Sequence, residues 1–353
     1  MKLELLEETE KEFLDTLIDK AEHIVVTGHK GPDGDAVGAC IGWADYLITQ
    51  RGKDVVIVMP DAFPNFLQWL PNIEKIVRFD KRREEAEELL QKADLLFCVD
   101  YNEPSRVDEM ETTLLASKAK KVMLDHHLHP VTTGMELVIS HPALSSASEV
   151  VFRTIWQLGG FPKMTHKGAT ALYCGMMTDT GGFTFNSNRS EIFFIICQLL
   201  TKGIDKDKIY RNVYNNYSAW AIRLRGYLLS EKMTYFDEYH AAYYVLTRKE
   251  MVRYHFVKGD VEGLVNEPLR IKGLKLSISL REDDRHDNLV WVSLRSVDDF
   301  PCNEMAKMFF NGGGHLNASG GRLMCSIVQA EKVVRNAISY YGKLLKENKN
   351  HHD

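Results

Sequence analysis

Four segments of this sequence carry carboxylate and imidazole side chains at spacings that could hold metal ions. They are His29-Lys30-Gly31-Pro32-Asp33-Gly34-Asp35, Asp100, Asp125-His126-His127 and Asp179. Mixed imidazole and carboxylate ligands suit Mn²⁺ or a similar divalent ion better than they suit a thiolate zinc site. Six such ligands are enough for two ions that share one carboxylate and one bridging water. Two ions about 3.5–4 Å apart activate that water and stabilise the attacking and leaving oxygens of a phosphoryl displacement.

The elements that precede these segments predict that the side chains converge. Three compact apolar runs, 23–27 (HIVVT), 95–99 (LLFCV) and 121–124 (KVML), each end just before a segment. Together with 54–59 (DVVIVM) they suit strands buried on both faces of a parallel sheet. Ligand sites in such sheets gather beyond the carboxyl ends of the strands. Asp179 follows an apolar helix expected over 169–177.

Helical stretches between the strands, over 36–49 and 104–119, predict a doubly wound, mainly parallel α/β sheet. We expect this catalytic domain to span residues 1–216 and to end in helices over 190–201 and 205–217. A helix within 217–234 would link it to a smaller α+β domain over 235–347, followed by a C-terminal tail, 348–353. That second domain is predicted from strands over 274–280 and 289–294, a glycine cluster and a helix over 329–346.

Each of these groups also has a purely structural explanation. Asp33 and Asp35 could cap a helix, Asp100 could simply end a strand, and the histidine-rich turn could be a polar loop. Arg106 and the run Ser145-Ser146-Ala147-Ser148-Glu149 are weaker site candidates, and a helix cap explains the run adequately. The joint occurrence of acid or imidazole groups at successive strand ends nevertheless favours a site over coincidence.

Composition restricts the function further. The chain has 353 residues, 44% of them hydrophobic and 26% charged, with a net charge of −5. A protein that grips long nucleic acid should show a basic face, and none is evident, so a short substrate is favoured. The acidic excess lies in residues 1–232, where acids could be metal ligands. Six scattered cysteines, no signal-peptide pattern and no membrane-spanning run predict a reduced, cytoplasmic protein without a membrane partner.

The ordered motifs resemble those of the DHH phosphoesterase superfamily. The resemblance rests on His29-x-x-x-Asp33-x-Asp35, Asp100, Asp125-His126-His127 and Asp179. In the second half, Gly312-Gly313-Gly314-His315-Leu316-Asn317-Ala318-Ser319-Gly320 is similar to the GGGHxxAAG signature of the DHH-associated C-terminal domain. Ser319 stands where the family usually has Ala. The resemblance covers about residues 20–345 and implies an active site in the cleft between the domains.

The resemblance also implies roles for individual residues. One metal would be held by His29, Asp33 and Asp100, and a second by Asp35, Asp100, His126 and Asp179, so that Asp100 is the bridging and catalytic carboxylate. His127 would be catalytic and reach the scissile phosphate or the leaving oxygen. Asp125 would orient a histidine, with direct metal ligation as the alternative. Two divalent ions are expected, Mn²⁺ first and Mg²⁺, Co²⁺ or Fe²⁺ as alternatives.

The glycine cluster could bind the substrate. Successive glycines let backbone N–H groups converge on an anion, and His315 adds a donor, so Gly313, Gly314 and His315 are candidate substrate-binding residues. Arg295 ends a predicted strand and resembles the family's phosphate-binding arginine, since a guanidinium fork suits a terminal phosphate. The alternatives are a simple turn and a surface arginine.

The function that follows is hydrolysis of short oligoribonucleotides, linear dinucleotides or 3′-phosphoadenosine 5′-phosphate (pAp) through a metal-bridging hydroxide, as in the nanoRNase branch. Alternatives are a cyclic dinucleotide phosphodiesterase or single-strand exonuclease of the same superfamily, a family-II-like pyrophosphatase, and an inactive nucleotide-binding protein. The GGGH-type second domain argues against the pyrophosphatase. Retention of all six ligand residues argues against the inactive protein. Whether the protein forms a homodimer is left open.

Overall fold

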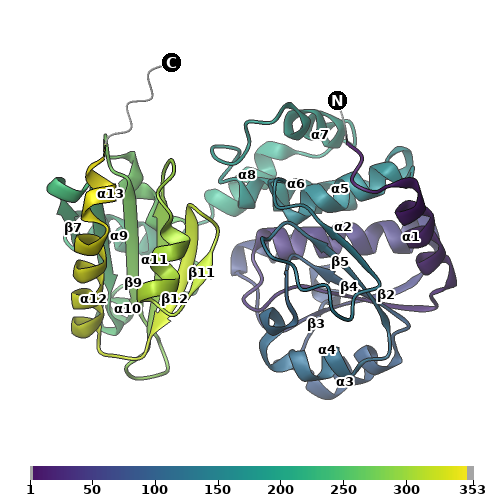
Figure 1. Cartoon of the computed structure of the whole chain (residues 1–353), viewed down its shortest axis with the longest axis horizontal. Helices are drawn as coiled ribbons and strands as arrows, with labels where there is room; N and C mark the ends of the chain where they lie inside the picture. Colours follow the sequence, from purple (N-terminus) through teal and green to yellow (C-terminus); the bar gives the residue numbers. More distant parts are fainter. Residues whose placement is uncertain (1–2, 348–353) are drawn as a thin grey trace. The chain divides into compact units, whose positions relative to one another are not determined.

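A computed structural model describes residues 3–347, and these divide into two compact units at the boundary between Asn216 and Tyr217 (Figure 1). The predicted C-terminal tail, 348–353, lies outside the described residues. None of the helices within residues 3–347 combines the length and the apolar character needed to cross a bilayer.

A six-stranded, wholly parallel sheet forms the centre of the first unit, in the order β3-β2-β1-β4-β5-β6. Its strands are β1 His23–Thr27, β2 Asp54–Met59, β3 Val77–Arg78, β4 Leu95–Val99, β5 Lys120–Asp125 and β6 Leu137–Ser140. Its helices are α1 Glu8–Lys20, α2 Gly34–Arg51, α3 Arg83–Lys92, α4 Glu111–Ala116, α5 Ala147–Gln157, α6 His166–Asp179, α7 Ser190–Leu200 and α8 Lys206–Tyr214.

Both faces of this sheet are buried, as the continuous apolar strand sequences predict. In β1, Ile24 and Val26 pack on one face with residues of α1, α2, α5 and α6, whereas Val25 packs on the other with residues of α3 and α4 (Figure 1). A β-strand points alternate side chains to opposite faces, so a strand covered on both sides must be apolar throughout. The α/β, doubly wound fold is confirmed.

The second unit contains a six-stranded mixed sheet in the order β11-β12-β10-β9-β8-β7. Its strands are β7 Met233–Phe236, β8 Ala241–Leu246, β9 Leu276–Glu282, β10 Val290–Ser296, β11 Gly313–Gly314 and β12 Ala318–Leu323. Its helices are α9 Ala219–Ser230, α10 Arg248–Arg253, α11 Cys302–Phe309, α12 Ile327–Tyr340 and α13 Gly342–Lys346. The pair β8–β9 is parallel and the other pairs are antiparallel.

Some helices differ from the sequence expectation. The stretch 104–119 holds a 3-10 segment, Pro104–Met110, and then α4, because Asp108 has a non-helical backbone with φ of 50°. The last helix is divided at Tyr341 into α12 and α13. The helix predicted as a linker is α9, whose Leu224 and Leu228 pack with Tyr244 of the second unit.

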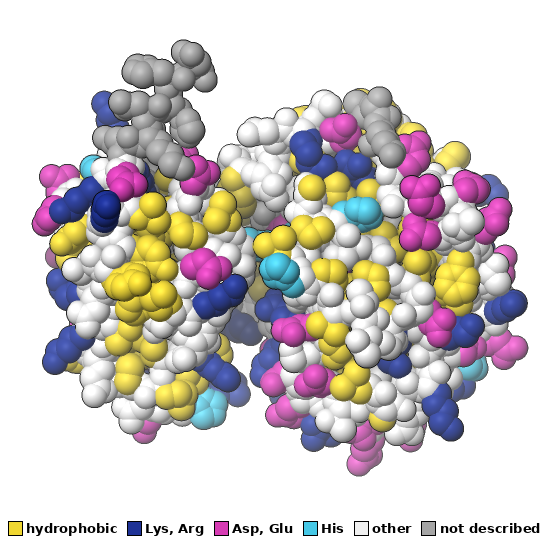
Figure 2. Space-filling view, in the orientation of Figure 1, with side chains coloured by type: hydrophobic (Ala, Val, Ile, Leu, Met, Phe, Trp, Pro, Cys, Tyr) yellow, Lys and Arg dark blue, Asp and Glu magenta, His cyan; other side chains and the backbone are white. Residues whose placement is uncertain are grey.

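Surface charge on the first unit does not lie only at the predicted site. Acidic side chains gather over α1 in Figure 2, and Glu8, Glu12 and Asp19 of this helix are exposed. Part of the acidic excess is therefore a solvated helix surface.

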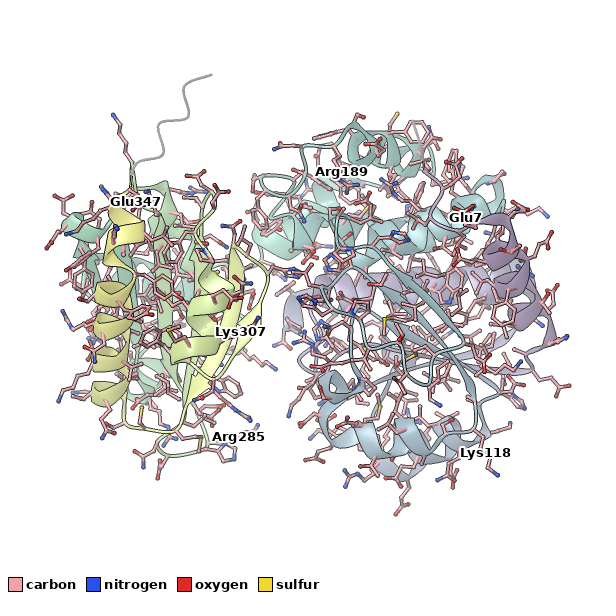
Figure 3. All side chains as sticks on the ribbon, viewed as in Figure 1. Glu7, Lys118, Arg189, Arg285, Lys307 and Glu347 are labelled. Atoms are coloured by element: carbon pink, nitrogen blue, oxygen red, sulfur yellow. The ribbon has the colours of Figure 1, made fainter. Side chains whose placement is uncertain are left out.

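The connection from α6 to α7 ends at Arg189, which is labelled in Figure 3.

Candidate metal centre

The predicted ligands lie where the order of the parallel strands reverses. The sheet places β1 between β2 and β4, so the chain leaves β1 towards one edge of the sheet and later returns to build the other. His29, Asp33 and Asp35 follow β1, and Asp100 follows β4, its neighbour in the sheet. Ligands of open α/β sheets bind at such a reversal, beyond the carboxyl ends of the strands.

His29, Asp33 and Asp100 form the first group, whose ligand atoms all lie within 4.8 Å of one another. His29 Nε2 is 3.5 Å from Asp100 Oδ2 and 4.0 Å from Asp33 Oδ1. His29 Nδ1 lies 2.9 Å from the Lys30 carbonyl oxygen, which can only accept, so Nδ1 donates and Nε2 faces the carboxylates. Asp33 also caps α2, because its Oδ1 accepts from the amides of Asp35 and Ala36.

Asp35, His126 and Asp179 form the second group, within the same 4.8 Å limit. His126 Nε2 lies 3.9 Å from Asp35 Oδ2, 3.6 Å from Asp179 Oδ2 and 3.5 Å from Asp100 Oδ1. The Nδ1 of His126 is 3.3 Å from the Leu144 carbonyl oxygen, which again assigns the donor to Nδ1 and turns Nε2 inward. Metal-binding histidines are commonly held this way by a carbonyl or carboxylate behind them.

Asp100 connects the two groups. Its Oδ2 faces His29 and its Oδ1 faces His126, while the residue is only 2% exposed. Oδ1 is buried and has no hydrogen-bond partner among the described residues, an unusual state for a carboxylate oxygen. The backbone of Asp100 has φ of 64°, a left-handed conformation that costs a non-glycine residue about 1–3 kcal/mol.

Asp125 hydrogen-bonds to His127. Its Oδ1 lies 2.8 Å from His127 Nδ1, and its Oδ2 accepts from the His127 backbone N–H at 3.0 Å. This fully buried carboxylate therefore bonds to the imidazole of His127 with one oxygen and to the backbone of His127 with the other. The alternative, Asp125 as a metal ligand, is less compatible with these two contacts, although Asp100, Asp125 and His127 also lie within 4.8 Å of one another.

Burial and mutual repulsion set the protonation of the cluster. Burial raises the pKa of Asp35 well above its usual range and the pKa of Asp179 to about 7, and nearby carboxylates add to both rises. Burial also disfavours the charged forms of His29 and Asp100, but their mutual attraction outweighs it. The pKa of His29 rises to about 9, and the pKa of Asp100 falls below its usual range because His126, and then His29, favour its charged form more than burial opposes it.

These groups fit divalent metal ions. They offer carboxylate oxygens and imidazole nitrogens, one oxygen is buried without a partner among the described residues, and the cluster retains protons that a cation would displace. The nearby thiols are poor ligands in comparison, since burial raises the pKa of Cys40 well above its usual range and that of Cys98 to about 11. The donor set is therefore one of carboxylates and imidazoles and not a thiolate site.

In the second unit, the predicted substrate residues surround one tight hairpin. Gly313 and Gly314 pair with Gly320 and Ser319, and Arg295 on the adjacent strand pairs with Ala318. His315 N–H donates to the Ala318 carbonyl oxygen at 2.9 Å, which closes the turn. Ser319, where the family usually has Ala, donates from Oγ to the His315 carbonyl oxygen at 2.8 Å.

Close backbone packing explains several of these glycines. A Cβ on Gly312 would lie 1.8 Å from the Gly320 carbonyl oxygen, and a Cβ on Gly314, whose φ is 138°, would lie 2.6 Å from the Ala318 carbonyl oxygen. Since the His315 amide is already bonded within the turn, the converging amides expected from the sequence are partly used by the hairpin itself. Binding of substrate by Gly313, Gly314, His315 and Arg295 stays a prediction.

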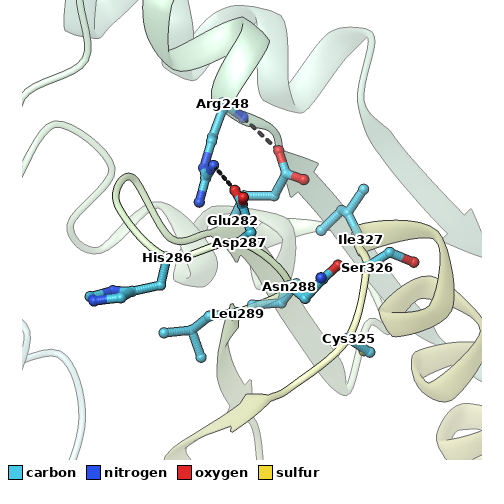
Figure 4. A pocket seen from close by; sticks show the side chains of 10 residues that line it. Arg248, Glu282, His286, Asp287, Asn288, Leu289, Cys325, Ser326 and Ile327 are labelled. Atoms are coloured by element: carbon cyan, nitrogen blue, oxygen red, sulfur yellow. Dashed lines mark hydrogen bonds and ion pairs between the residues drawn. The ribbon is translucent and has the colours of Figure 1, made fainter.

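A separate pocket of about 350 Å³ lies at the turn between β9 and β10 (Figure 4). Its lining includes Arg248, Glu282 and Asp287. The Arg248 guanidinium is bonded to Asp287 and to the Asp283 carbonyl oxygen, so its charge is already offset. The pocket lies at the other end of β10 from Arg295 and contains none of the predicted substrate residues.

Comparison with known proteins shows the family of this chain. The DHH family, N-terminal domain, matches residues 23–176, which include His29, Asp100 and the Asp125–His127 triplet. A crystal structure of an exopolyphosphatase-related protein from Bacteroides fragilis has 45% sequence identity and a TM-score of 0.93, and the match covers 98% of this chain and 99% of that one. The chain belongs to the DHH family.

Other relatives of this DHH protein carry names that state an activity. A probable bifunctional oligoribonuclease and PAP phosphatase NrnA of Streptococcus mutans is 26% identical over 298 residues, 84% of this chain and 88% of the relative. The bifunctional NrnA of Thermus thermophilus is 26% identical over 300 residues, 85% of this chain and 84% of the relative. The cyclic-di-AMP phosphodiesterase PdeA of Listeria monocytogenes is 26% identical over 344 residues, and the chain spans about half of that longer protein, 49%.

Family membership and the site together identify a hydrolase of the phosphoesterase type. DHH phosphoesterases depend on divalent metal, and the acidic and imidazole groups of this chain lie where such ions could bind. The structure brings all six predicted ligands into two adjoining groups with Asp100 between them. The assignment of each ligand to a particular ion stays a prediction.

Two contributions to the site were not predicted from the sequence. The backbone N–H groups of Ala147 and Ser148 donate to Asp35, at 2.6 Å to Oδ2 and 2.9 Å to Oδ1. Gly175 of α6 leaves the space in which Asp35 and Ser148 lie, because a Cβ there would be 1.9 Å from Ser148 Oγ. The only sequence signal was the polar run 145–149 before an apolar helix, and its helix-cap role is also present, since Ser146 Oγ accepts from Glu149 N–H.

Proposed function

We propose that this DHH protein hydrolyses short oligoribonucleotides, linear dinucleotides or pAp with two divalent ions, Mn²⁺ first. The observation that carries the proposal is the arrangement around Asp100, whose two oxygens face two separate groups of ligands. The NrnA relatives support the substrate class, because the match runs along most of both chains. The net charge of −5 also favours a substrate of a few nucleotides.

Each residue would have a defined task. Bound ions would activate a water molecule and stabilise the attacking and leaving oxygens of the phosphoester. His29, Asp33 and Asp100 would hold one ion, and Asp35, Asp100, His126 and Asp179 the other. The Leu144 and Lys30 carbonyl oxygens hold Nδ1 of the two imidazoles, which would leave Nε2 free to bind an ion.

His127 would act on the substrate. Asp125 holds Nδ1, so Nε2 would be the ring atom that reaches an oxygen of the scissile phosphate or the leaving group. When protonated, the ring donates from both nitrogens, to Asp125 and to that oxygen. Water then replaces the nucleoside oxygen on phosphorus, and the leaving oxygen takes a proton.

The second unit would recognise the end of the substrate. We expect Arg295 to bind a terminal phosphate through its guanidinium, with His315 and its neighbouring glycines beside it, as the resemblance implies. Dimerisation and a cytoplasmic location stay predictions of the sequence.

A parallel assay tests the substrate. Purified protein with Mn²⁺ is given a linear dinucleotide, pAp, cyclic di-AMP and pyrophosphate, and the products are separated by ion-exchange chromatography. We expect turnover of the dinucleotide and of pAp. Cyclic di-AMP is included because PdeA matches 94% of this chain at 26% identity, and its preferred cleavage would favour that activity instead. Bound Mn²⁺ without turnover of any substrate would contradict the proposal and favour a nucleotide-binding protein.

A further inference from the structure

A fully buried carboxylate, Glu149, bonds to the loop whose backbone contacts Asp35 and His126, and it is not itself one of the proposed metal ligands. It is 0% exposed, and both of its oxygens are saturated. Oε1 accepts from Arg153 Nε at 3.0 Å and from Arg153 Nη2 at 2.6 Å. Oε2 accepts from Arg189 Nη2 at 2.7 Å and from both donors of Ser145, N–H at 2.8 Å and Oγ–H at 2.7 Å. Because burying a charged group is costly, a carboxylate that is fully buried and fully bonded serves a purpose other than keeping the protein soluble.

The Ser145 contacts anchor the loop that positions two ligands of the same ion. One residue before Ser145, the Leu144 carbonyl oxygen accepts from His126 Nδ1. Two and three residues after it, the amides of Ala147 and Ser148 hold the two oxygens of Asp35. Movement of Ser145 would therefore disturb His126 and Asp35 together.

The contact with Arg189 involves a second segment, the one that follows Asp179, the third ligand of this ion. Asp179 ends α6, and the connection that follows it ends at Arg189, just before α7 (Figure 3). The ion pair between Arg189 and Glu149 fixes the far end of that connection against α5. Glu149 thus holds the loop whose backbone groups contact His126 and Asp35, and it also holds the end of the connection that follows Asp179. Its own hydrogen bonds within the described part of the chain do not include His29 or Asp33.

We propose that Glu149 is a positioning residue for one of the two metal ions, the one assigned to Asp35, His126 and Asp179. This inference rests on the proposed function, since it concerns the same metal centre. Its consequence is selective: loss of Glu149 or of its contact with Ser145 weakens the metal-binding step that uses Asp35, His126 and Asp179 more than the step that uses His29 and Asp33.

The test is a Mn²⁺ titration followed by electron paramagnetic resonance of the free ion, on the full chain. For wild type we expect two binding steps. Glu149→Gln should weaken one step about 10- to 100-fold, the usual effect of removing a group that orients metal ligands. Asp179→Asn should weaken the same step, and His29→Asn the other.

Glu149→Gln leaves two guanidinium groups without their full counter-charge and could fail to fold. Ser145→Ala provides the milder variant, because it removes only the Oγ donor and keeps the backbone N–H. It should weaken the same step by a smaller factor, about two- to fivefold. Asp45→Asn is the matched control, a carboxylate of the same unit that is 7% exposed and accepts from Thr165 Oγ1 at 2.7 Å. It should lower the melting temperature without changing either step.

The outcomes separate the two proposals. If wild type binds no Mn²⁺, the proposed function is wrong. If wild type binds two ions but Ser145→Ala and Glu149→Gln bind both as wild type does, the positioning role is wrong. Equal weakening of both steps, matched by Asp45→Asn, would also overturn it, because that pattern reports a loss of stability alone.

Discussion

We expect that alanine cannot replace Gly175 without loss of activity. The reason is the lack of space for a Cβ and not the backbone conformation. It lies within α6, where alanine is normally preferred over glycine by about 1 kcal/mol. A Cβ at this position would meet Ser148 Oγ at 1.9 Å and Asp35 Oδ1 at 2.8 Å, whereas ordinary contacts begin at 3.4 Å. The Ser148 hydroxyl would have to move by about 1.5 Å, and Asp35 by several tenths of an ångström.

Stability and activity should therefore respond to Gly175→Ala very differently. Overpacking costs about 1–3 kcal/mol, and the gain in helix propensity offsets about 1 kcal/mol, so the protein should lose at most about 2 kcal/mol. A misplacement of about 1 Å at a reacting centre can cost about 100-fold in rate. We expect kcat/KM for bis(p-nitrophenyl) phosphate with Mn²⁺ to fall by about that factor, with only a few degrees of change in Tm.

Two further variants control this experiment. A Cβ on Gly226 in α9 would meet no atom within 4 Å among the described residues, so Gly226→Ala should keep full activity and a Tm at or above that of wild type. Adding Ser148→Gly to Gly175→Ala removes the nearest clash and should recover part of the activity. If Gly175→Ala keeps wild-type kcat/KM and Mn²⁺ affinity, the close approach of α6 does not set the position of Asp35.

Three other predictions concern single residues. Asp100→Ala should abolish hydrolysis while circular dichroism shows an intact fold; near-wild-type activity would contradict the assignment of Asp100 to both ions. Arg295→Ala should weaken pAp and dinucleotide hydrolysis more than bis(p-nitrophenyl) phosphate hydrolysis, and equal losses would remove Arg295 from substrate recognition. In metal-free protein, the His29 pKa of about 9 exceeds its ordinary 6.5, so its contribution to stability is present below pH 6.5 and is lost as the pH rises towards 9. Urea midpoints should fall over that interval, and His29→Asn should reduce the fall; an identical pH dependence in both proteins would refute the His29 assignment.

The sequence predicts the gathering of the candidate ligands, because most of them follow directly after strand ends. The runs 23–27 and 95–99 match β1 and β4 residue for residue, and each is apolar because both faces of the sheet are covered. Once those strands are parallel neighbours, the groups after them meet at one edge. This strand arrangement is enough to predict that His29, Asp35 and Asp100 lie close together.

Contacts made by the backbone could not be predicted in the same way. The amides that hold Asp35 and the carbonyl oxygen that holds His126 carry no side-chain signal. The left-handed backbone of Asp100 and the space at Gly175 depend on tertiary packing around them. The glycines near His315 are a clear sequence signal with two explanations. They are expected to bind an anion, and a tight hairpin also requires them.

Electron paramagnetic resonance of the Mn²⁺-loaded protein tests the central claim most directly. A carboxylate shared by two ions couples their electron spins, so wild type with two equivalents of Mn²⁺ should give an exchange-coupled spectrum. Asp100→Asn, which keeps the size of the side chain, should bind Mn²⁺ more weakly and lose the coupling. A wild-type spectrum of isolated Mn²⁺ at every loading would contradict a pair of ions held around Asp100.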